Sequence, residues 1–139
     1  MLRYIPAVLS PDMVKVLMEM GHGDEILLAD ANFPAYTNNH RVIRADGIGI
    51  PELLEAIVKL MPLDTYSPWQ VGLMEPVQGD PRPEIWDTYA RIISQEMPDY
   101  TVNAFERSAF YEHTPRVSAV ILTGERALYG NIILKKGVL

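Results

Sequence analysis

The sequence predicts an α/β fold with a largely parallel central sheet. Short apolar runs alternate along the chain with amphipathic segments, which is the pattern of strands separated by crossover helices. The clearest strand candidates are continuously apolar, as expected for strands buried on both faces. A chain of 139 residues is in the range of one compact unit, so we expect a single domain over residues 1–139.

The N-terminal part predicts a helix followed by a strand. Ser10 and Pro11 form an N-cap and first-turn pair, and apolar residues at helical spacing continue until Gly21. After the turn, the apolar run at 26–29 predicts a buried strand. Asp30 therefore stands where this strand ends.

The middle of the chain predicts two further helices around a strand. Pro51 begins a segment with apolar residues at helical spacing, and Pro62 ends it. Residues 71–74 fit a strand, and the Pro and Gly residues at 79–83 indicate a loop. Apolar and aromatic residues at helical spacing over 85–93 predict the next helix.

The C-terminal part predicts three strands and one short helix. Residues 101–106 fit a strand, and 108–113 fit a short helix. Residues 117–123 are the most hydrophobic run in the chain and predict a central strand. Residues 132–134 predict one more short strand, with no internal repeat or low-complexity segment anywhere.

Composition excludes several classes of function. Hydrophobic residues make up 48% and charged residues 22% of the chain, as in ordinary globular proteins. A net charge of -6 argues against nucleic acid or an anionic membrane as partner, because both attract clustered Lys and Arg. Without cysteine there are no disulfides or thiolate sites. The first residues fit neither a signal peptide nor a membrane span, so we expect a cytoplasmic protein.

His22 is the best candidate for a general acid or base. It lies between Gly21 and Gly23, which cannot shield it, and an unperturbed imidazole titrates close to neutral pH. The alternative is a solvated turn residue at a helix end, where a cation gains from the helix dipole. Residue chemistry alone leaves the two interpretations even.

Several acidic and amide residues are candidates for binding a polar ligand that carries hydroxyl groups. Asp30 and Asn32 follow the first strand and offer acceptors for hydroxyl groups, although an Asx turn explains them equally well. Asp64 follows the helix stop and could orient or activate a hydroxyl, or could simply be solvated. The Tyr129-Gly130-Asn131 turn places a phenol and an amide on either side of a flexible residue, as a clamp or as an ordinary turn.

Arg107 and its aromatic neighbours form a second candidate group. The guanidinium is a rigid fork of donors suited to vicinal hydroxyls, and Phe110 and Tyr111 offer faces for the apolar side of a sugar ring. The competing interpretation makes Arg107 a surface ion-pair partner and the aromatics core residues. His40 and His113 have no ligand spacing to His22, so no zinc site is expected. The glycines do not form a phosphate loop.

Longer motifs carry a family resemblance over nearly the whole chain. They are MGHGDEILLADANFP, IRADGIGIPELLEAI, ERSAFYE and TGERALYGNIILKKGVL. Together they resemble the ribose pyranase and fucose mutarotase family. Arg107 precedes SAFYE where ribose-type members commonly carry a histidine, so the chain is most similar to the fucose-type branch.

The resemblance assigns roles to individual residues. It implies that His22 is the catalytic proton donor and that Tyr111 and Asp64 assist it. It implies substrate contacts from Asp30, Arg107, Tyr129 and Asn131. It implies no metal and no cofactor, because opening and closing a sugar ring needs only acid and base groups.

The resemblance also implies an architecture and a reaction. The family has a three-layer α/β/α fold and forms homo-oligomeric rings, often decamers, with active sites at subunit interfaces. The expected reaction interconverts the α and β anomers of L-fucose, and related reducing sugars are further candidates. The alternatives are a pyranose to furanose conversion of D-ribose and a non-catalytic protein that binds or senses a sugar.

Overall fold

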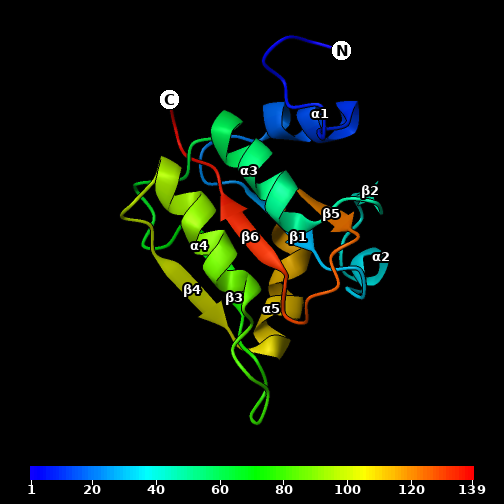
Figure 1. Cartoon of the computed structure of the whole chain (residues 1–139), viewed down its shortest axis with the longest axis vertical. Coiled ribbons are helices and arrows are strands. Elements are labelled where there is room, and N and C mark those ends of the chain that lie inside the picture. Colours follow the sequence, from blue (N-terminus) through cyan, green and yellow to red (C-terminus); the bar gives the residue numbers. More distant parts are fainter.

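Six strands form one mixed sheet at the centre of the molecule (Figure 1). The computed structural model describes residues 1–139. The strands are β1 (Glu25–Ala29), β2 (Val42–Ala45), β3 (Val71–Met74), β4 (Val102–Phe105), β5 (Ala119–Thr123) and β6 (Ile132–Lys135). The helices are α1 (Pro11–Glu19), α2 (Ala35–Asn38), α3 (Ile50–Leu60), α4 (Ile85–Glu96) and α5 (Arg107–His113), and a 3-10 turn covers Thr114–Arg116.

The sheet has the order β2-β5-β1-β6-β3-β4 and is parallel except at β6. This strand runs antiparallel to both of its neighbours, β1 and β3. The connection from β5 to β6 contains no helix that would carry the chain back across the sheet. β6 therefore begins on the side of the sheet where β5 ends and runs in the opposite direction. The predicted largely parallel sheet is therefore confirmed, with one inverted strand at its centre.

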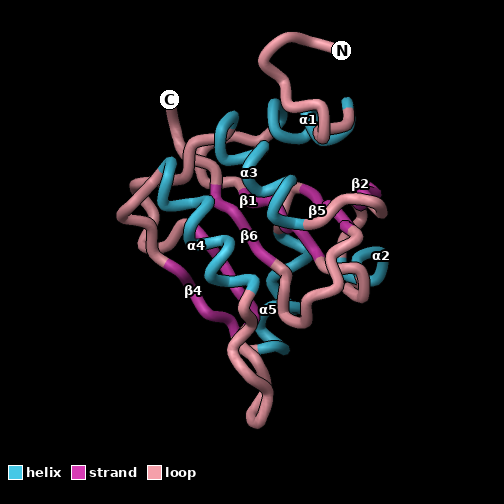
Figure 2. The backbone as a smooth tube through the Cα atoms, in the orientation of Figure 1, coloured by secondary structure: helices cyan, strands magenta, loops and turns pink.

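Helices cover both faces of the sheet. Side chains alternate along β1, so Ile26 and Leu28 pack in a core with α1, α3 and α4, while Leu27 and Ala29 pack in a second core with α5. In Figure 2, α3 and α4 pass in front of the strands and α5 lies behind them. The continuously apolar strands are explained by these two cores, and the three-layer α/β/α fold is confirmed.

Most predicted elements are present, with shifts of one to three residues at their ends. The predicted strand at 117–123 is β5, which begins at Ala119 and pairs on both sides. Two elements were not predicted, α2 and the edge strand β2. Both have only 4 residues, too few to show a period. The longest helix, α4, has 12 residues, so none of the helices could span a bilayer.

The parallel strands define two opposite edges of the sheet. We call the edge where β1, β3, β4 and β5 end, and where β6 begins, the carboxyl edge. The opposite edge, where β1 begins and β6 ends, is the amino edge. These two edges carry all the predicted site residues.

Candidate active site

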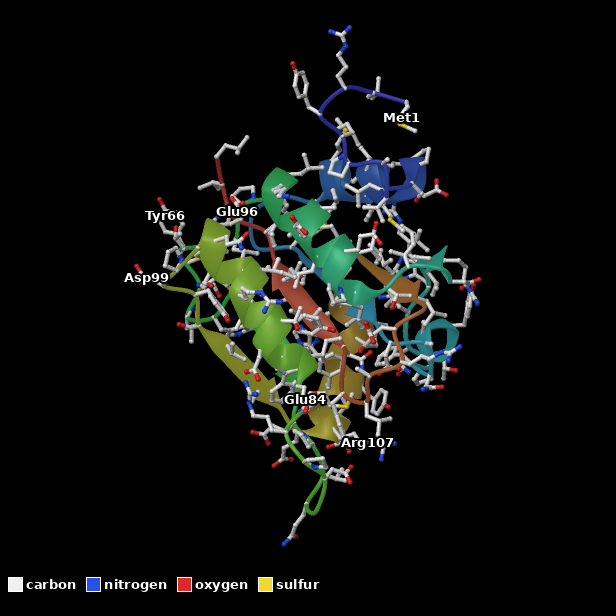
Figure 3. All side chains as sticks on the ribbon, viewed as in Figure 1. Met1, Tyr66, Glu84, Glu96, Asp99 and Arg107 are labelled. Atoms are coloured by element: carbon white, nitrogen blue, oxygen red, sulfur yellow. The ribbon has the colours of Figure 1, made fainter.

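The predicted site residues fall into two groups at opposite edges. His22 and Asp64 lie at the amino edge, and the others lie at the carboxyl edge: Asp30, Arg107, Tyr111, Tyr129 and Asn131. The five residues of β1 separate His22 from Asp30, and at about 3.3 Å per residue the strand spans roughly 16 Å. In Figure 3, Tyr66, which contacts His22, lies at the upper left of the molecule and Arg107 at the lower right. One chain therefore does not bring the two groups together.

His22 and Asp64 form a hydrogen-bonded pair at the amino edge. His22 Nε2 lies 2.9 Å from Asp64 Oδ1, and the ring packs edge-on against Tyr66 with centroids 5.5 Å apart. The His22 side chain is 46% exposed, whereas that of Asp64 is only 5% exposed. The imidazole of His22 is therefore accessible to solvent, and a buried carboxylate fixes its position.

The charge state of Asp64 determines which nitrogen of His22 is available. Burial alone raises the pKa of Asp64, but hydrogen bonds from His22 and the Tyr66 N–H, together with the charges of His22 and Lys135, lower it below its usual value. Ionised Asp64 can only accept, so Nε2 of the neutral ring carries the proton. Nδ1 is then the basic nitrogen and is free to meet a substrate.

The alternative interpretations of these two residues have different outcomes. His22 does lie in an exposed turn, as its alternative states, but it is not the cation at the end of α1. The C-terminal carbonyls of α1, which would attract a cation, are occupied by Lys136, whose Nζ lies 3.1 Å from the Leu17 carbonyl and 2.5 Å from that of Met20. His22 bonds to Asp64 instead. Asp64 is 4% exposed, so it is not a solvated acidic residue.

Asp30 and Asn131 form a buried reciprocal pair at the carboxyl edge. Asn131 Oδ1 accepts from the Asp30 N–H at 2.8 Å, and its Nδ2 donates to Asp30 Oδ2 at 2.9 Å. Asp30 Oδ1 also accepts from the Asn32 N–H at 2.9 Å, so the predicted Asx turn is present alongside this pair. Burial raises the pKa of Asp30 despite these hydrogen bonds.

Helix α4 holds the turn that carries Tyr129. Trp86 Nε1 donates to the Tyr129 carbonyl at 3.0 Å, and the Tyr89 hydroxyl donates to the Gly130 carbonyl at 2.7 Å. Tyr129 has a φ of 57°, a left-handed conformation that costs energy for a residue with a side chain. Its hydroxyl donates to Asp80 Oδ2 at 2.5 Å, and this bond raises the pKa of the phenol. The turn is a fixed structure rather than a flexible loop.

Arg107 lies over the ring of Tyr111 at the carboxyl edge. Its Cζ lies 5.8 Å from the centroid of the Tyr111 ring, and Tyr111 stacks on Phe33 at 5.5 Å. Arg107 is exposed and forms no ion pair, so the surface ion-pair interpretation does not hold. Phe110 has no exposed surface and is a core residue, so its predicted role as a face for a sugar ring is wrong.

The chain matches a known family over almost its whole length. Residues 3–139 match the model of the RbsD / FucU transport protein family. The chain belongs to this family. Within it, a fucose mutarotase of Danio rerio is 48% identical over 145 residues, which cover 99% of this chain and 94% of the relative.

Two solved RbsD / FucU structures resemble the chain closely. A fucose mutarotase from Streptococcus pneumoniae in complex with L-fucose superposes with a TM-score of 0.96 at 50% identity, covering 99% of each chain. FucU from Bifidobacterium longum superposes with a TM-score of 0.93 at 44% identity, covering 97% of this chain and 98% of the other. These likenesses extend over the helices, the sheet and both edges.

Several residues that contact the predicted site of this RbsD / FucU chain were missed from the sequence. Tyr66 donates its N–H to Asp64 from two residues away, which is a local Asx signal. Asp80 and Tyr89 reach the Tyr129 turn from 49 and 41 residues away, so no spacing rule reveals them. No group of three or more His, Asp or Glu side chains is arranged as a metal site.

Proposed function

We propose that this chain is an L-fucose mutarotase, an isomerase that interconverts the α and β anomers of L-fucose. The observation that carries the proposal is the likeness over 99% of both chains to a fucose mutarotase whose structure holds L-fucose. The residues at both edges supply the groups that the reaction needs. The amino edge offers an acid or base, and the carboxyl edge offers donors and acceptors for hydroxyl groups.

The reaction opens a cyclic hemiacetal and closes it again. A base takes the proton of the anomeric hydroxyl, its oxygen becomes the aldehyde oxygen, and the bond from the anomeric carbon to the ring oxygen breaks. An acid gives a proton to the ring oxygen as it leaves. Rotation of the aldehyde and attack of the same hydroxyl on the other face give the second anomer, so atoms and charges balance without a redox step.

His22 transfers the proton in this proposal. With Nε2 bonded to ionised Asp64, Nδ1 accepts a proton in the neutral ring and donates it once the ring is charged. Asp64 holds the ring orientation and stabilises the imidazolium. Tyr111, which lies with Arg107 at the carboxyl edge, is proposed as the second acid or base.

The carboxyl edge binds the sugar in this proposal. The oxygens of Asp30 retain lone pairs beyond the hydrogen bonds to Asn32 and Asn131, and these accept from sugar hydroxyls. Arg107 donates to vicinal hydroxyls, while Tyr129 and Asn131 fix the direction of the remaining contacts. Because the pair and the turn are held by buried partners, the binding groups are preorganised.

We further propose that neighbouring copies complete each site within a homo-oligomeric ring, a decamer. A single sugar cannot contact groups separated by the length of β1, so the amino edge of one copy must meet the carboxyl edge of the next. Apolar side chains that a neighbour would cover are exposed at the N-terminus and on α1: Met1, Leu2, Tyr4 and Met18. We place the enzyme in the cytoplasm, a compartment suited to a chain that needs no disulfide.

Anomer exchange measured by NMR tests the proposed function. Saturation transfer between the two anomeric protons of L-fucose should accelerate with the wild-type chain, and His22→Ala should reduce the rate by roughly 10²- to 10⁴-fold. His40→Ala is the matched control, because His40 is exposed and contacts neither group. Binding of L-fucose without faster exchange would refute the proposal, and faster exchange of D-ribose than of L-fucose would reassign the substrate.

A further inference from the structure

Three charged or titratable side chains cluster next to the His22–Asp64 pair without a part in the proposed reaction. They are Glu25 at the start of β1, Lys135 at the end of β6 and His113 at the end of α5. Their side chains are only 12%, 13% and 18% exposed. Charged groups so deeply buried are costly unless paired, so their arrangement requires an explanation.

The ammonium group of Lys135 is the centre of this cluster. Its Nζ lies 3.4 Å from Glu25 Oε1, donates to Ser67 Oγ at 3.0 Å and stands 3.6 Å above the centroid of the Trp69 ring. A cation over an indole face that is largely shielded from water is strongly held. Glu25 uses its other oxygen to contact His113 Nε2, which fixes the carboxylate as well.

These contacts join the two segments that carry the catalytic pair. Glu25 follows His22 by three residues, and Ser67 and Trp69 lie in the loop between α3 and β3 that also carries Asp64. The backbone of Lys135 binds the same loop, since its carbonyl accepts from the Asp64 N–H at 3.1 Å and its N–H donates to the Gln70 carbonyl at 3.0 Å. Lys135 therefore contacts the two segments that carry His22 and Asp64, although it does not contact His22 itself.

We propose that Lys135 is a positioning residue for the His22–Asp64 pair. Its side chain ties the loop that carries Asp64 to the start of β1, and its charge favours the ionised carboxylate that fixes the imidazole. This inference rests on the proposed function, because it assigns Lys135 to the same proton-transfer site. Lys135 acts through Asp64, so it is not itself a catalytic residue.

Lys135 acts on Asp64 through its charge as well as through its contacts. Hydrogen bonds from His22 and the Tyr66 N–H do most to lower the pKa of Asp64, and the charge of Lys135 adds a smaller part. The other charged or titratable groups facing these residues are Asp24, which binds the Gly21 N–H beside His22, Tyr66, Glu25 and His113. Lys135 keeps its positive charge in the ion pair with Glu25, so this charge also acts on Asp64.

The tautomer of His22 and the rate of anomer exchange together test this role. In the wild-type chain, ¹⁵N shifts of neutral His22 should report the Nε2–H form. In Lys135→Met we expect a mixture of the two forms and a fall in kcat with KM unchanged. The fall in kcat should be about 10- to 100-fold, which is the range found when a residue that orients a metal ligand is replaced. Lys135→Arg keeps a cation over Trp69 and should retain most of the rate.

Lys136→Met is the matched control. The side chain of Lys136 binds the carbonyls at the end of α1 and not the catalytic pair, and the substitution leaves its backbone bonds to Gly23 and Asp24 in place. Loss of this side chain should therefore lower stability and leave the His22 tautomer and the rate per folded chain unchanged. If Lys135→Met does not fold, the double variant Lys135→Met with Glu25→Gln removes both buried charges and should show the same loss of kcat. A wild-type tautomer and kcat in the folded variant would overturn the inference. Failure of the wild-type chain to accelerate exchange would instead overturn the proposed function.

Discussion

Replacing Asn131 by Asp creates a second carboxylate in the buried pair with Asp30. The new oxygen takes the place of Asn131 Nδ2, which lies 2.9 Å from Asp30 Oδ2. Two unit charges at that distance repel by roughly 6 kcal/mol at an effective dielectric constant of about 20. Keeping one carboxyl protonated at pH 7 costs roughly 4 kcal/mol, because an ordinary Asp has a pKa near 3.9 and each pH unit is worth about 1.4 kcal/mol. The variant therefore takes up a proton.

This proton uptake gives the variant a characteristic pH dependence. The pKa of the shared carboxyl is higher in the folded chain than in the unfolded chain. The loss of folding free energy is therefore present at pH values above the unfolded pKa and shrinks as the pH falls toward that pKa. Urea unfolding should show a loss of roughly 4 kcal/mol at pH 7 that narrows by about 1.4 kcal/mol per pH unit toward pH 5. All samples need the same protein concentration, since assembly adds to stability.

Asn103→Asp is the control for this experiment. Asn103→Asp adds the same charge on the edge strand β4, where Asn103 is half-buried and has no side-chain hydrogen bond to a carboxylate, so its effect should be small at every pH. An equal loss of stability at pH 7 and pH 5 in Asn131→Asp would show that Asp30 and residue 131 do not share a proton. The paired geometry at the carboxyl edge would then be refuted.

Two further substitutions test how the carboxyl edge is held. Tyr89→Phe removes the buried donor to the Gly130 carbonyl and should cost about 1 to 2 kcal/mol in thermal or urea unfolding; a neutral result would mean that this bond does not hold the turn. Gly124→Ala places a methyl group 2.2 Å from the Asp46 carbonyl oxygen and should cost at least about 1 to 3 kcal/mol. Gly47→Ala meets no atom within 4 Å and should be nearly neutral, so equal losses at the two glycines would contradict the packing.

The layered fold was predictable because its signals are local. The Ser10-Pro11 cap and the apolar run at 26–29 each specify an element within a few residues, and the two cores explain why the strands are apolar throughout. The direction of β6 was missed, although the short connection from β5, predicted without a helix, favours a reversed strand. The short elements α2 and β2 are set by tertiary contacts rather than by a period.

The site was predictable as a set of residue types but not as an arrangement. The apolar run at 26–29 already separates His22 from Asp30, but nothing in the sequence indicates which distant residues join each of them. The Asp64 contact with His22 spans 42 residues, and the Lys135 contact with Ser67 spans 68. Contacts at such separations come from the topology of the sheet and leave no local pattern.

Subunit mixing tests the central claim that one active site is built from the two edges of neighbouring chains. His22→Ala and Asp30→Ala should each be nearly inactive in the exchange of L-fucose anomers. When the two variants are unfolded, mixed in equal amounts and refolded together, random assembly should restore about one quarter of the wild-type rate, because some sites then combine two intact edges. A mixture no more active than either variant alone, with wild-type mixtures refolding fully, would show that the two edges do not meet and would contradict the account.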